Sequence, residues 1–574
     1  MAVDISIRIT GQAGQGIQSI SSIMGKVFTR QGYYVFIIQD AESRIRGGHN
    51  FDQVRIKDKP VLAIHAQANY LICLDGKTVE QDLPVLTPNG VMIYDGSQTR
   101  FESDNPNHFS IPLEQIALEA GQKKIMVNAV ATGAAFALMG FDLRPLLDRL
   151  AEEFAGKGQE IAAHNQSSAS AGYRYVRENF RGRAADQIPP GVFAKQKLLI
   201  NGSQAMALGA ICAGLKFYSG YPMSPSTPIM EFVAAAAQDH HIICEPAEDE
   251  IAAVNMVIGA GFAGVRAMTA TSGGGFCLMT EALGLAGMTE TPLVIVVAQR
   301  PGPSTGLPTR TEQGDLRFAM HAAHGEFPRA VLAPGHAAQA FYLMARAFNL
   351  AERYQTPVIV LGDQHLNDSY CTVDELDLNR MTIDRGKVVF DDQIASVKDY
   401  KRYVWQESGI SPRILPGLSE AVVYADSDEH TDAGHITESS EVRNQMVRKR
   451  MRKLAGMRQE MGSPEIYPSQ RAALVLLGWG SLYGAMKEAV ELLQQDGIPA
   501  QMCHFSQIYP FTAQAFHRKI LKKSRILAVE NNYSGQFADF FTQETGRAVC
   551  HKILKYDGRP FAPREIVDQV KEKM

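Results

Sequence analysis

Hydrophobic residues near the start of the chain follow first a strand pattern and then a helix pattern. Isoleucines alternate with polar residues over 5–9, recur three or four positions apart over 17–27, and give way to a second apolar segment at 33–40. The loop GQAGQG at 11–16 separates the first two segments. This order predicts a Rossmann-like, doubly wound α/β domain. We place its end near residue 190, where a polar stretch closes with Pro-Pro-Gly.

Residues 196–375 again alternate between strand-like and helix-like segments, and the strands are almost entirely apolar. The strand-like segments are KLLI at 197–200, HIIC at 241–244, RAMTAT at 266–271, LVIVVA at 293–298 and PVIVLGD at 357–363. Continuous apolar strands predict a parallel sheet covered by helices on both faces.

Residues 376–465 interrupt this alternation, and residues 466–574 resume it. The interruption contains SDEHTDAGHITESS and then a basic run at 442–461, which we interpret as a connector ending in one exposed helix with a solvated charged face. The apolar segments ALVLLGWGS, PAQMCHF and RILAVENNYSGQ predict a further α/β domain after it. The sequence therefore predicts a multidomain α/β protein with sheet domains over 1–190, 196–375 and 466–574.

Composition and charge are those of an ordinary globular protein. Of 574 residues, 45% are hydrophobic and 21% charged, and the formal net charge is -4, which gives no reason to expect nucleic acid or an anionic membrane as a partner. The apolar runs are strand-length, too short to span a membrane. MAVDISIRITG, the first segment, lacks the features of a signal peptide, so we expect a cytoplasmic protein.

The cysteines are widely separated in the sequence. They are Cys73, Cys212, Cys244, Cys277, Cys371, Cys503 and Cys550, and none forms a CxxC pair. Zinc and iron–sulfur sites usually require closely spaced thiolates, so we expect no metal ligands in this chain. We expect reduced, small apolar side chains of a cytosolic protein instead.

Two glycine-containing segments near the start are candidates for ligand contacts. The amides of GQAGQG could bind a phosphate at a helix N-terminus, with Asp40 at the end of the next strand, or the glycines could serve only close packing. Arg44 and Arg46 in SRIRGGHN have the geometry to bind an acidic ligand, or they could be solvated. The residues alone leave both choices open.

The segment from 218 to 315 holds the strongest chemical signals. In YPMSPSTP at 221–228 three prolines fix the backbone and present hydroxyls, which favours a ligand contact over a simple helix cap. The acids at 248–250 begin a helix; two suit its dipole, and one carboxylate could face a cleft. Arg300 follows the most apolar strand and precedes PSTGLPT, so a carboxylate pocket is favoured over a structural ion pair.

Together these motifs resemble the α subunits of 2-oxoacid:ferredoxin oxidoreductases of the long type, with the γ domain fused in front. The resemblance covers nearly the whole chain and is closest to 2-oxoglutarate:ferredoxin oxidoreductase. It implies a γ domain at the start (GxxGxG, RGGxN), then a thiamine diphosphate pyrimidine-binding domain (YPxxPST, TSGGG, PSTGLPT). A transketolase C-terminal-like domain (LLGWGS, AVENNYSGQ) would follow the connector.

The resemblance also implies roles for individual residues. Glu250 aligns with the catalytic glutamate that binds N1' of the aminopyrimidine ring and favours its imino tautomer. The other residues at the cofactor are Tyr221, Pro222, Ser272 and Gly273, and those at the 2-oxoacid are Ser224, Arg300 and Thr309. Ser224 stands where the family usually has threonine, so a hydroxyl is kept but a methyl group is lost.

Segments that the chain lacks imply a partner. Thiamine diphosphate enzymes hold Mg²⁺ and the diphosphate with GDG and an asparagine about 25 to 30 residues later, and GDG is absent from this sequence. The resemblance therefore implies a β subunit that carries this segment and a [4Fe-4S] cluster, in a heterotetramer of two α and two β subunits. Coenzyme A would take up the acyl group, and ferredoxin the electrons.

The substrate is the most open question. Arg44 and Arg46 favour 2-oxoglutarate, because they could neutralise a second carboxylate that pyruvate lacks. Pyruvate or mixed 2-oxoacids remain alternatives within the family, as does the reverse reductive carboxylation. Outside this family, the alternatives are an NAD-binding oxidoreductase that uses GQAGQG and a non-catalytic scaffold subunit.

Overall fold

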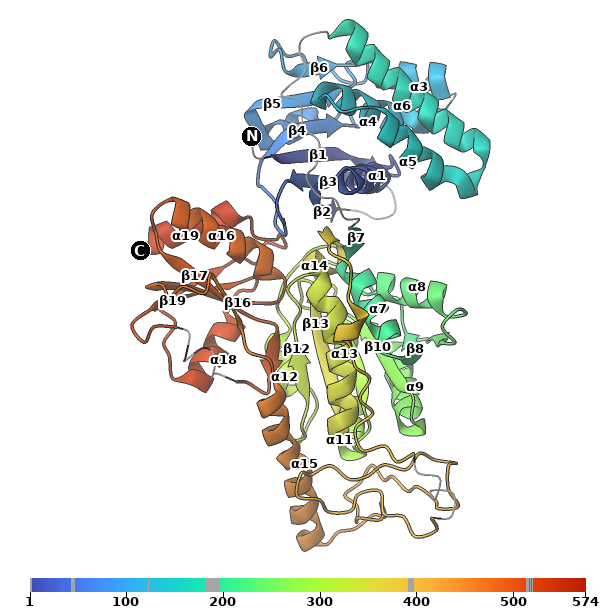
Figure 1. Ribbon diagram of the computed structural model, residues 1–574, viewed down its shortest axis with the longest axis vertical. Helices are drawn as coiled ribbons and strands as arrows, with labels where there is room; N and C mark the ends of the chain where they lie inside the picture. The colour runs from blue at the N-terminus through green and yellow to red at the C-terminus, as the bar shows by residue number, and fades with distance from the viewer. Residues whose placement is uncertain are drawn as a thin grey trace. The chain divides into compact units, whose positions relative to one another are not determined.

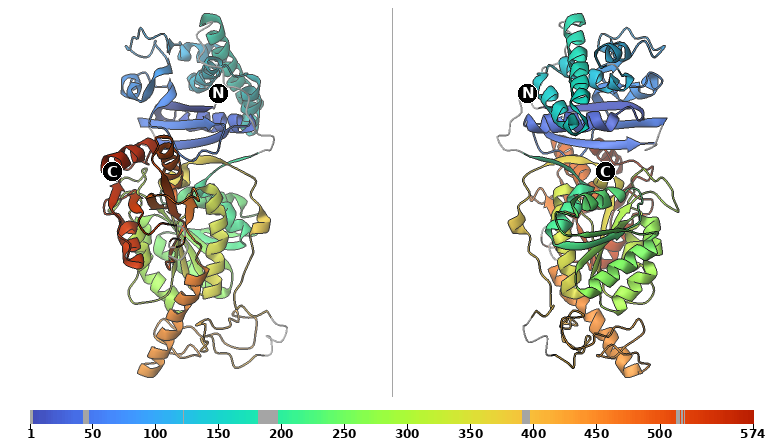
Figure 2. Two further views of the ribbon diagram at one scale, coloured as in Figure 1. Left: turned by 60° about the vertical axis from the view of Figure 1, so that its left-hand side comes forward. Right: turned by 90° about the vertical axis from the view of Figure 1, so that its right-hand side faces the viewer.

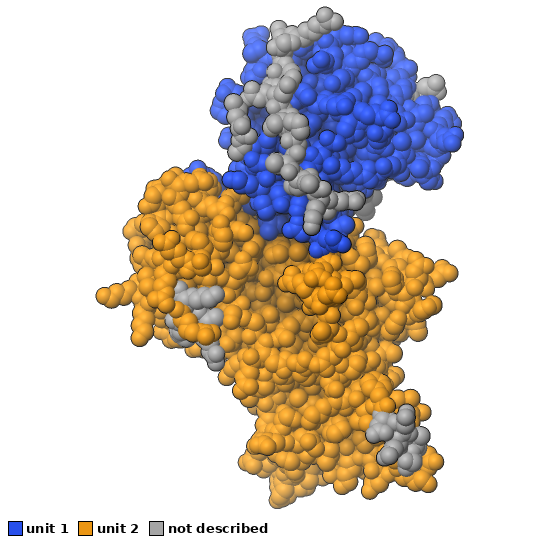
Figure 3. All heavy atoms as spheres, viewed as in Figure 1, with its two compact units in different colours: residues 1–200, 369–375, 562–564 blue, residues 201–368, 376–561, 565–574 orange. Residues whose placement is uncertain are grey.

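The computed structural model describes residues 3–42, 47–121, 123–180, 197–390, 397–512, 516, 518 and 520–574. The chain folds into two compact units (Figures 1 and 3). The first unit comprises residues 1–200, 369–375 and 562–564, and the second comprises 201–368, 376–561 and 565–574.

The first unit is an eight-stranded mixed sheet with helices. Its strands lie in the order β6-β5-β4-β1-β3-β2-β14-β7. The strands are β1 (Asp4–Ala13), β2 (Tyr34–Ala41), β3 (Gly47–Lys57), β4 (Ala68–Cys73), β5 (Leu86–Tyr94), β6 (His108–Ser110), β7 (Leu198–Asn201) and β14 (Tyr370–Val373). The main helices are α1 (Ile17–Arg30), α3 (Leu113–Gly121), α4 (Val127–Met139), α5 (Arg144–Phe154) and α6 (Gln159–Asn179).

The predicted strand–loop–helix–strand segment is present as β1, α1 and β2, but β2 does not lie beside β1. Strand β3 lies between them and pairs antiparallel with both, from Asp4↔Lys57 on one side and Tyr34↔Lys57 on the other. The glycines of RGGHN, one of the two glycine-containing candidate segments, begin this strand. Strand β7 also joins the first sheet, although its sequence had suggested that it starts the next domain.

The second unit contains two sheets (Figure 2). The larger has the order β18-β12-β13-β11-β10-β8-β9, and all its printed pairs are parallel except that of β12 with β18. Its strands are β8 (Leu215–Gly220), β9 (Ile243–Pro246), β10 (Arg266–Thr271), β11 (Leu293–Gln299), β12 (Ala330–Leu332), β13 (Pro357–Asp363) and β18 (Gln507–Tyr509). The helices are α7 (Gly202–Cys212), α8 (Thr227–Ala236), α9 (Glu250–Ala263), α10 (Gly273–Leu278), α11 (Thr280–Met288), α12 (Leu316–His321), α13 (Ala337–Tyr354) and α14 (Gln364–Asp368).

The smaller sheet has the order β15-β17-β16-β19-β20 and shares its hydrophobic core with the larger one. Its strands are β15 (Glu465–Tyr467), β16 (Leu474–Trp479), β17 (Ala500–Phe505), β19 (Arg525–Glu530) and β20 (His551–Leu554). The helices beside it are α16 (Tyr483–Gln495), α18 (Gln536–Thr545) and α19 (Pro563–Lys573). One apolar cluster includes Ile295 from the larger sheet and Phe505 from the smaller, so the two sheets pack as one body.

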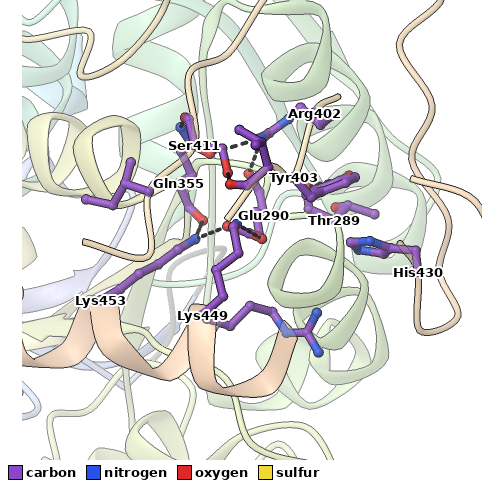
Figure 4. Close-up of polar contacts among 12 residues, drawn as sticks. Thr289, Glu290, Gln355, Arg402, Tyr403, Ser411, His430, Lys449 and Lys453 are labelled. Carbon is purple, nitrogen blue, oxygen red and sulfur yellow. Dashed lines mark hydrogen bonds and ion pairs between the residues drawn. The ribbon is translucent and has the colours of Figure 1, made fainter. Parts of the chain in front are cut away.

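The connector ends in α15 (Ser440–Glu460), whose basic residues are divided between an exposed face and a buried one. Lys449 and Lys453 are 0% and 1% exposed, and each places Nζ 2.6 Å from a different carboxylate oxygen of Glu290, which follows α11 (Figure 4). Arg402 donates to the carbonyl of Glu290 and to Oε1 of Gln355, both at 2.9 Å. The predicted solvated face is therefore wrong for these lysines, which are paired with an acid distant in the sequence, whereas most of the other basic residues of the helix are exposed. We call Glu290, Gln355, Arg402, Lys449 and Lys453 the connector clamp.

Candidate active site

The sequence motifs meet at one edge of the larger sheet. Strands β9, β8, β10 and β11 are parallel neighbours, and each is followed at its carboxyl end by one of the predicted motifs. Ligands of open α/β sheets bind at this edge. The arrangement therefore brings the four motifs into one candidate site, as the sequence had suggested.

The three acids that begin α9 have different surroundings. Asp249 is the N-cap and accepts a hydrogen bond from the amide of Ala252 at 2.8 Å, whereas Glu248 is exposed. Glu250 is 3% exposed, and its Oε1 has no hydrogen-bond partner in the described part of the chain. An unpaired buried carboxylate oxygen is costly, so Glu250 is the acid that points to a missing ligand.

The glycine loop TSGGG leaves space for Glu250. A Cβ atom at Gly275 would lie 2.4 Å from Glu250 Oε1 and 2.1 Å from Thr271 Oγ1, so only glycine fits there. The hydroxyl of Ser272 donates to the sulfur of Met223, 2.7 Å away, which joins this loop to YPMSPST. Gly273 lies at the start of α10.

Arg300 has free hydrogen-bonding capacity beside Ser224. Its Nη1 donates to the carbonyl of Ser224 at 2.6 Å, and no carboxylate pairs with it among the residues that the structure describes. Desolvation lowers the pKa of Arg300, which nevertheless stays a cation. A half-buried guanidinium with unused donors is suited to a ligand carboxylate.

The positions of the other predicted residues say less about a ligand. Tyr221 is 39% exposed, Pro222 is exposed, and Thr309 is half-buried in the loop after Arg300. Arg44 and Arg46 lie outside the described residues.

Two acids that follow PSTGLPT had no predicted role. Asp315 Oδ2 is buried and unpaired, and a Cβ at Gly273 would lie 2.4 Å from it. Burial raises the pKa of Asp315 to about 6, and burial together with Asp315 raises the pKa of Glu312 to about 7. Both lie in TRTEQGD, and only the fold brings Asp315 next to Gly273. Met223, between the prolines of YPMSPST, also had no predicted role.

The loop GQAGQG lies between two cavities of the first unit, of about 460 and 530 Å³. Gly14 and Gly16 have φ angles of 96° and 81°, which glycine adopts without strain. Asp40 lines one cavity, and Lys77 and Lys124 line the other. A phosphate contact at this loop stays a prediction.

No helix in the described part of the chain is both long and apolar enough to cross a membrane.

Two family models match the sequence. Residues 208–449 match the one described as "Pyruvate flavodoxin/ferredoxin oxidoreductase, thiamine diP-bdg", and residues 6–175 match "Pyruvate ferredoxin/flavodoxin oxidoreductase". The first range contains all four motifs of the candidate site.

Several known proteins are similar over most of their length. The 2-oxoacid:ferredoxin oxidoreductase subunit alpha of Saccharolobus solfataricus is 32% identical over 99% of this chain and 97% of its own. The 2-oxoglutarate synthase subunit KorA of Methanothermobacter thermautotrophicus is 31% identical over 65% of this chain and 98% of its own. The solved 2-oxoglutarate:ferredoxin oxidoreductase from Magnetococcus marinus, with 2-oxoglutarate, coenzyme A and succinyl-CoA bound, has a TM-score of 0.91 at 32% identity and matches over 99% of each chain.

Proposed function

Because the chain belongs to the 2-oxoacid:ferredoxin oxidoreductase α subunits, we propose that it supplies half of an active site for 2-oxoglutarate. The reaction is the coenzyme A-dependent oxidative decarboxylation to succinyl-CoA and CO₂, with reduction of ferredoxin, or the reverse carboxylation. The observation that carries this proposal is the buried, unpaired Oε1 of Glu250 beside the glycine loop.

The residues present fit a thiamine diphosphate pyrimidine ring. Glu250 offers a buried carboxylate that can share a proton with a ring nitrogen, and Gly275 leaves the carboxylate unobstructed. When bound, thiamine diphosphate supplies the nucleophilic carbon and the electron sink of the decarboxylation. Ser272 and Gly273 follow the neighbouring strand β10, and Tyr221 and Pro222 follow β8, so these four residues would line the ring's surroundings.

Arg300 would hold the carboxylate of the 2-oxoacid next to the reacting carbon. Its free donors support a bidentate contact, while Ser224 and Thr309 would add hydroxyl donors. This role positions the substrate and needs no proton transfer by Arg300, whose guanidinium stays charged.

A β subunit would complete the site. This chain has neither GDG nor closely spaced cysteines, so the Mg²⁺-diphosphate segment and the [4Fe-4S] cluster would come from the β subunit of an α₂β₂ complex. Co-expression with the β subunit, followed by viologen reduction with a panel of 2-oxoacids, tests the function. Turnover of 2-oxoglutarate by the complex supports it, and absence of turnover with every 2-oxoacid contradicts it.

Replacing Arg300 with Met should raise the KM for the 2-oxoacid by about 10²-fold, because a charged, bidentate contact to the carboxylate is lost. Steady-state viologen reduction by the complex measures this change. Arg448→Met is the control, because Arg448 is exposed on α15. An unchanged KM in the Arg300 variant would remove Arg300 from the substrate site.

Replacing both Arg44 and Arg46 with Ala should raise the KM for 2-oxoglutarate far more than the KM for 2-oxobutyrate. The reason is that 2-oxobutyrate has no second carboxylate for these guanidinium groups to neutralise. Comparing the two KM values in one assay checks the substrate assignment, and equal effects on both substrates argue against it. The name of the Magnetococcus marinus structure supports 2-oxoglutarate, whereas the broader name of the Saccharolobus relative leaves other 2-oxoacids open.

A further inference from the structure

The loop that carries Arg300 and Thr309 has little regular structure of its own. It spans residues 300–315, between β11 and α12, and we call it the substrate loop. Its internal backbone hydrogen bonds include Leu307 to Pro301 and Arg310 to Leu307, both at 3.1 Å, and Leu307 at its tip is 48% exposed. Residues around the loop must therefore fix its two halves. We call these halves the Arg300 limb and the Thr309 limb.

Gln299 fixes the base of the loop at the Arg300 end. Its side chain is fully buried; Nε2 donates to the carbonyl of Gly362 at 2.9 Å, and Oε1 accepts from the amide of Asp315 at 3.0 Å. The amide thus joins the end of β11 to the end of β13 and to the last residue of the substrate loop.

Gln313 fixes the other limb to the smaller sheet. Its side chain donates to the carbonyl of Trp479 at 3.0 Å and accepts from the amide of Asn531 at 3.2 Å. Its backbone amide donates to the carbonyl of Asn531 at 2.7 Å, and its carbonyl accepts from Asn532 Nδ2 at 3.1 Å. Trp479 ends β16, and the two asparagines directly follow β19.

Neighbouring residues make the same attachment. The amide of Thr311 donates to the carbonyl of Gly558 at 3.3 Å, and Gln536 Nε2 donates to the carbonyl of Gly314 at 2.7 Å. The limb that leads to Thr309 is therefore held in place by the smaller sheet, whereas Arg300 is held in place by the larger one.

Glutamine is required at both positions by hydrogen-bond chemistry. Each side chain donates to a carbonyl and accepts from an amide, and among unbranched side chains of this length only the neutral primary amide of glutamine does both at neutral pH. A glutamate at 313 would turn an oxygen toward the carbonyl of Trp479, and a methionine would leave both groups unpaired.

We propose that Gln299 and Gln313 are positioning residues for the 2-oxoacid: they hold the two limbs of the substrate loop so that Arg300 and Thr309 meet the same carboxylate. This inference rests on the proposed function, because it takes Arg300 and Thr309 as substrate-binding residues. It assigns the smaller sheet a part in substrate affinity, since that sheet sets the position of the Thr309 limb.

The test compares Gln313→Met with Gln355→Met in the complex with the β subunit. Gln355 is a matched control, because it is 1% exposed and its amide also donates to a carbonyl, of Ser411, and accepts from Arg402, but in the connector clamp. Gln313→Met should raise the KM for the 2-oxoacid by about 10- to 100-fold with a smaller change in kcat. Gln355→Met should lower the Tm comparably and leave the KM unchanged.

Gln536→Met is the second variant, which decides the question if Gln313→Met fails to assemble. Gln536 is only partly buried and holds the same limb through Gly314, so the KM of this variant for the 2-oxoacid should also rise. An unchanged KM in both assembled variants, or in Gln536→Met when it alone assembles, overturns the positioning role. If Arg300→Met raises the KM in that experiment, the proposed function survives; if the unmodified complex turns over no 2-oxoacid, the proposed function fails instead.

Discussion

Replacing Glu250 with Gln lowers the kcat of the reconstituted complex by an expected factor of about 10² to 10⁴. The side chain is 3% exposed and its Oε1 has no partner among the described residues, so the amide keeps the shape of the site but removes the negative charge and with it the ability to share a proton. Viologen reduction with saturating 2-oxoglutarate measures the loss. Thiamine diphosphate binding by calorimetry shows whether the cofactor still enters.

Glu248→Gln is the matched control for this experiment. Glu248 lies two residues earlier at the start of the same helix and is exposed, so its variant should retain full activity. A Glu250 variant as active as this control would mean that the chain is a scaffold for a site located elsewhere. Reduction of NAD by the chain alone would favour the nucleotide-binding alternative.

The sequence was sufficient to predict where the candidate site lies, because its motifs follow predicted strands. Near-continuous apolar strands such as 293–298 predict a parallel sheet, and residues directly after such strands must lie at its carboxyl edge. The structure accordingly places Ser224, Glu250, Ser272 and Arg300 after neighbouring strands. Spacing alone could not show which acid of 248–250 faces the site, because that depends on the packing of α9 against Gly275; only the resemblance indicated Glu250.

Long-range pairings could not be predicted. Local alternation identifies β2 as a strand but cannot show that β3 separates it from β1, or that residues 370–373 join the first sheet after 169 residues spent mostly in the second unit. The expected boundaries at 190, 375 and 465 stay predictions. The role of the two glutamines at the substrate loop could not be predicted either. Their partners lie at distant strands, and the sequence of the loop does not show which strands these are.

The basic run at 442–461 shows why charge patterns mislead. Alternating lysines and arginines usually mark a solvated helix face, but three basic residues of α15, Lys449, Arg450 and Lys453, are buried. Lys449 and Lys453 are buried because Glu290, more than 150 residues earlier, is buried opposite them. Burial would raise the pKa of Glu290, but Lys453, Lys449 and Arg402 hold it well below its usual range.

Replacing Glu290 with Gln should lower the free energy of unfolding of the second unit by about 3 to 5 kcal/mol, because two buried ammonium groups lose their counter-charge. Urea unfolding followed by tryptophan fluorescence measures this unit, since Trp405 and Trp479 both belong to it. Desolvation lowers the pKa of Lys453 even with Glu290 present, whose charge raises that pKa. The variant removes this charge, so the pKa of Lys453 should fall further. A lysine with a lowered folded pKa binds fewer protons than in the unfolded chain, so the stability of the variant should rise with pH above the folded pKa.

Glu281→Gln is the control, because Glu281 is exposed on α11, the helix that precedes Glu290, and should change stability by no more than about 0.5 kcal/mol. The pH series separates the connector clamp from a general packing defect. A loss caused by uncompensated charge shrinks as the lysines deprotonate, whereas a packing defect keeps the same size at every pH. If Glu290→Gln is as stable as Glu281→Gln, or its deficit does not change with pH, the buried charges do not hold α15 to the larger sheet.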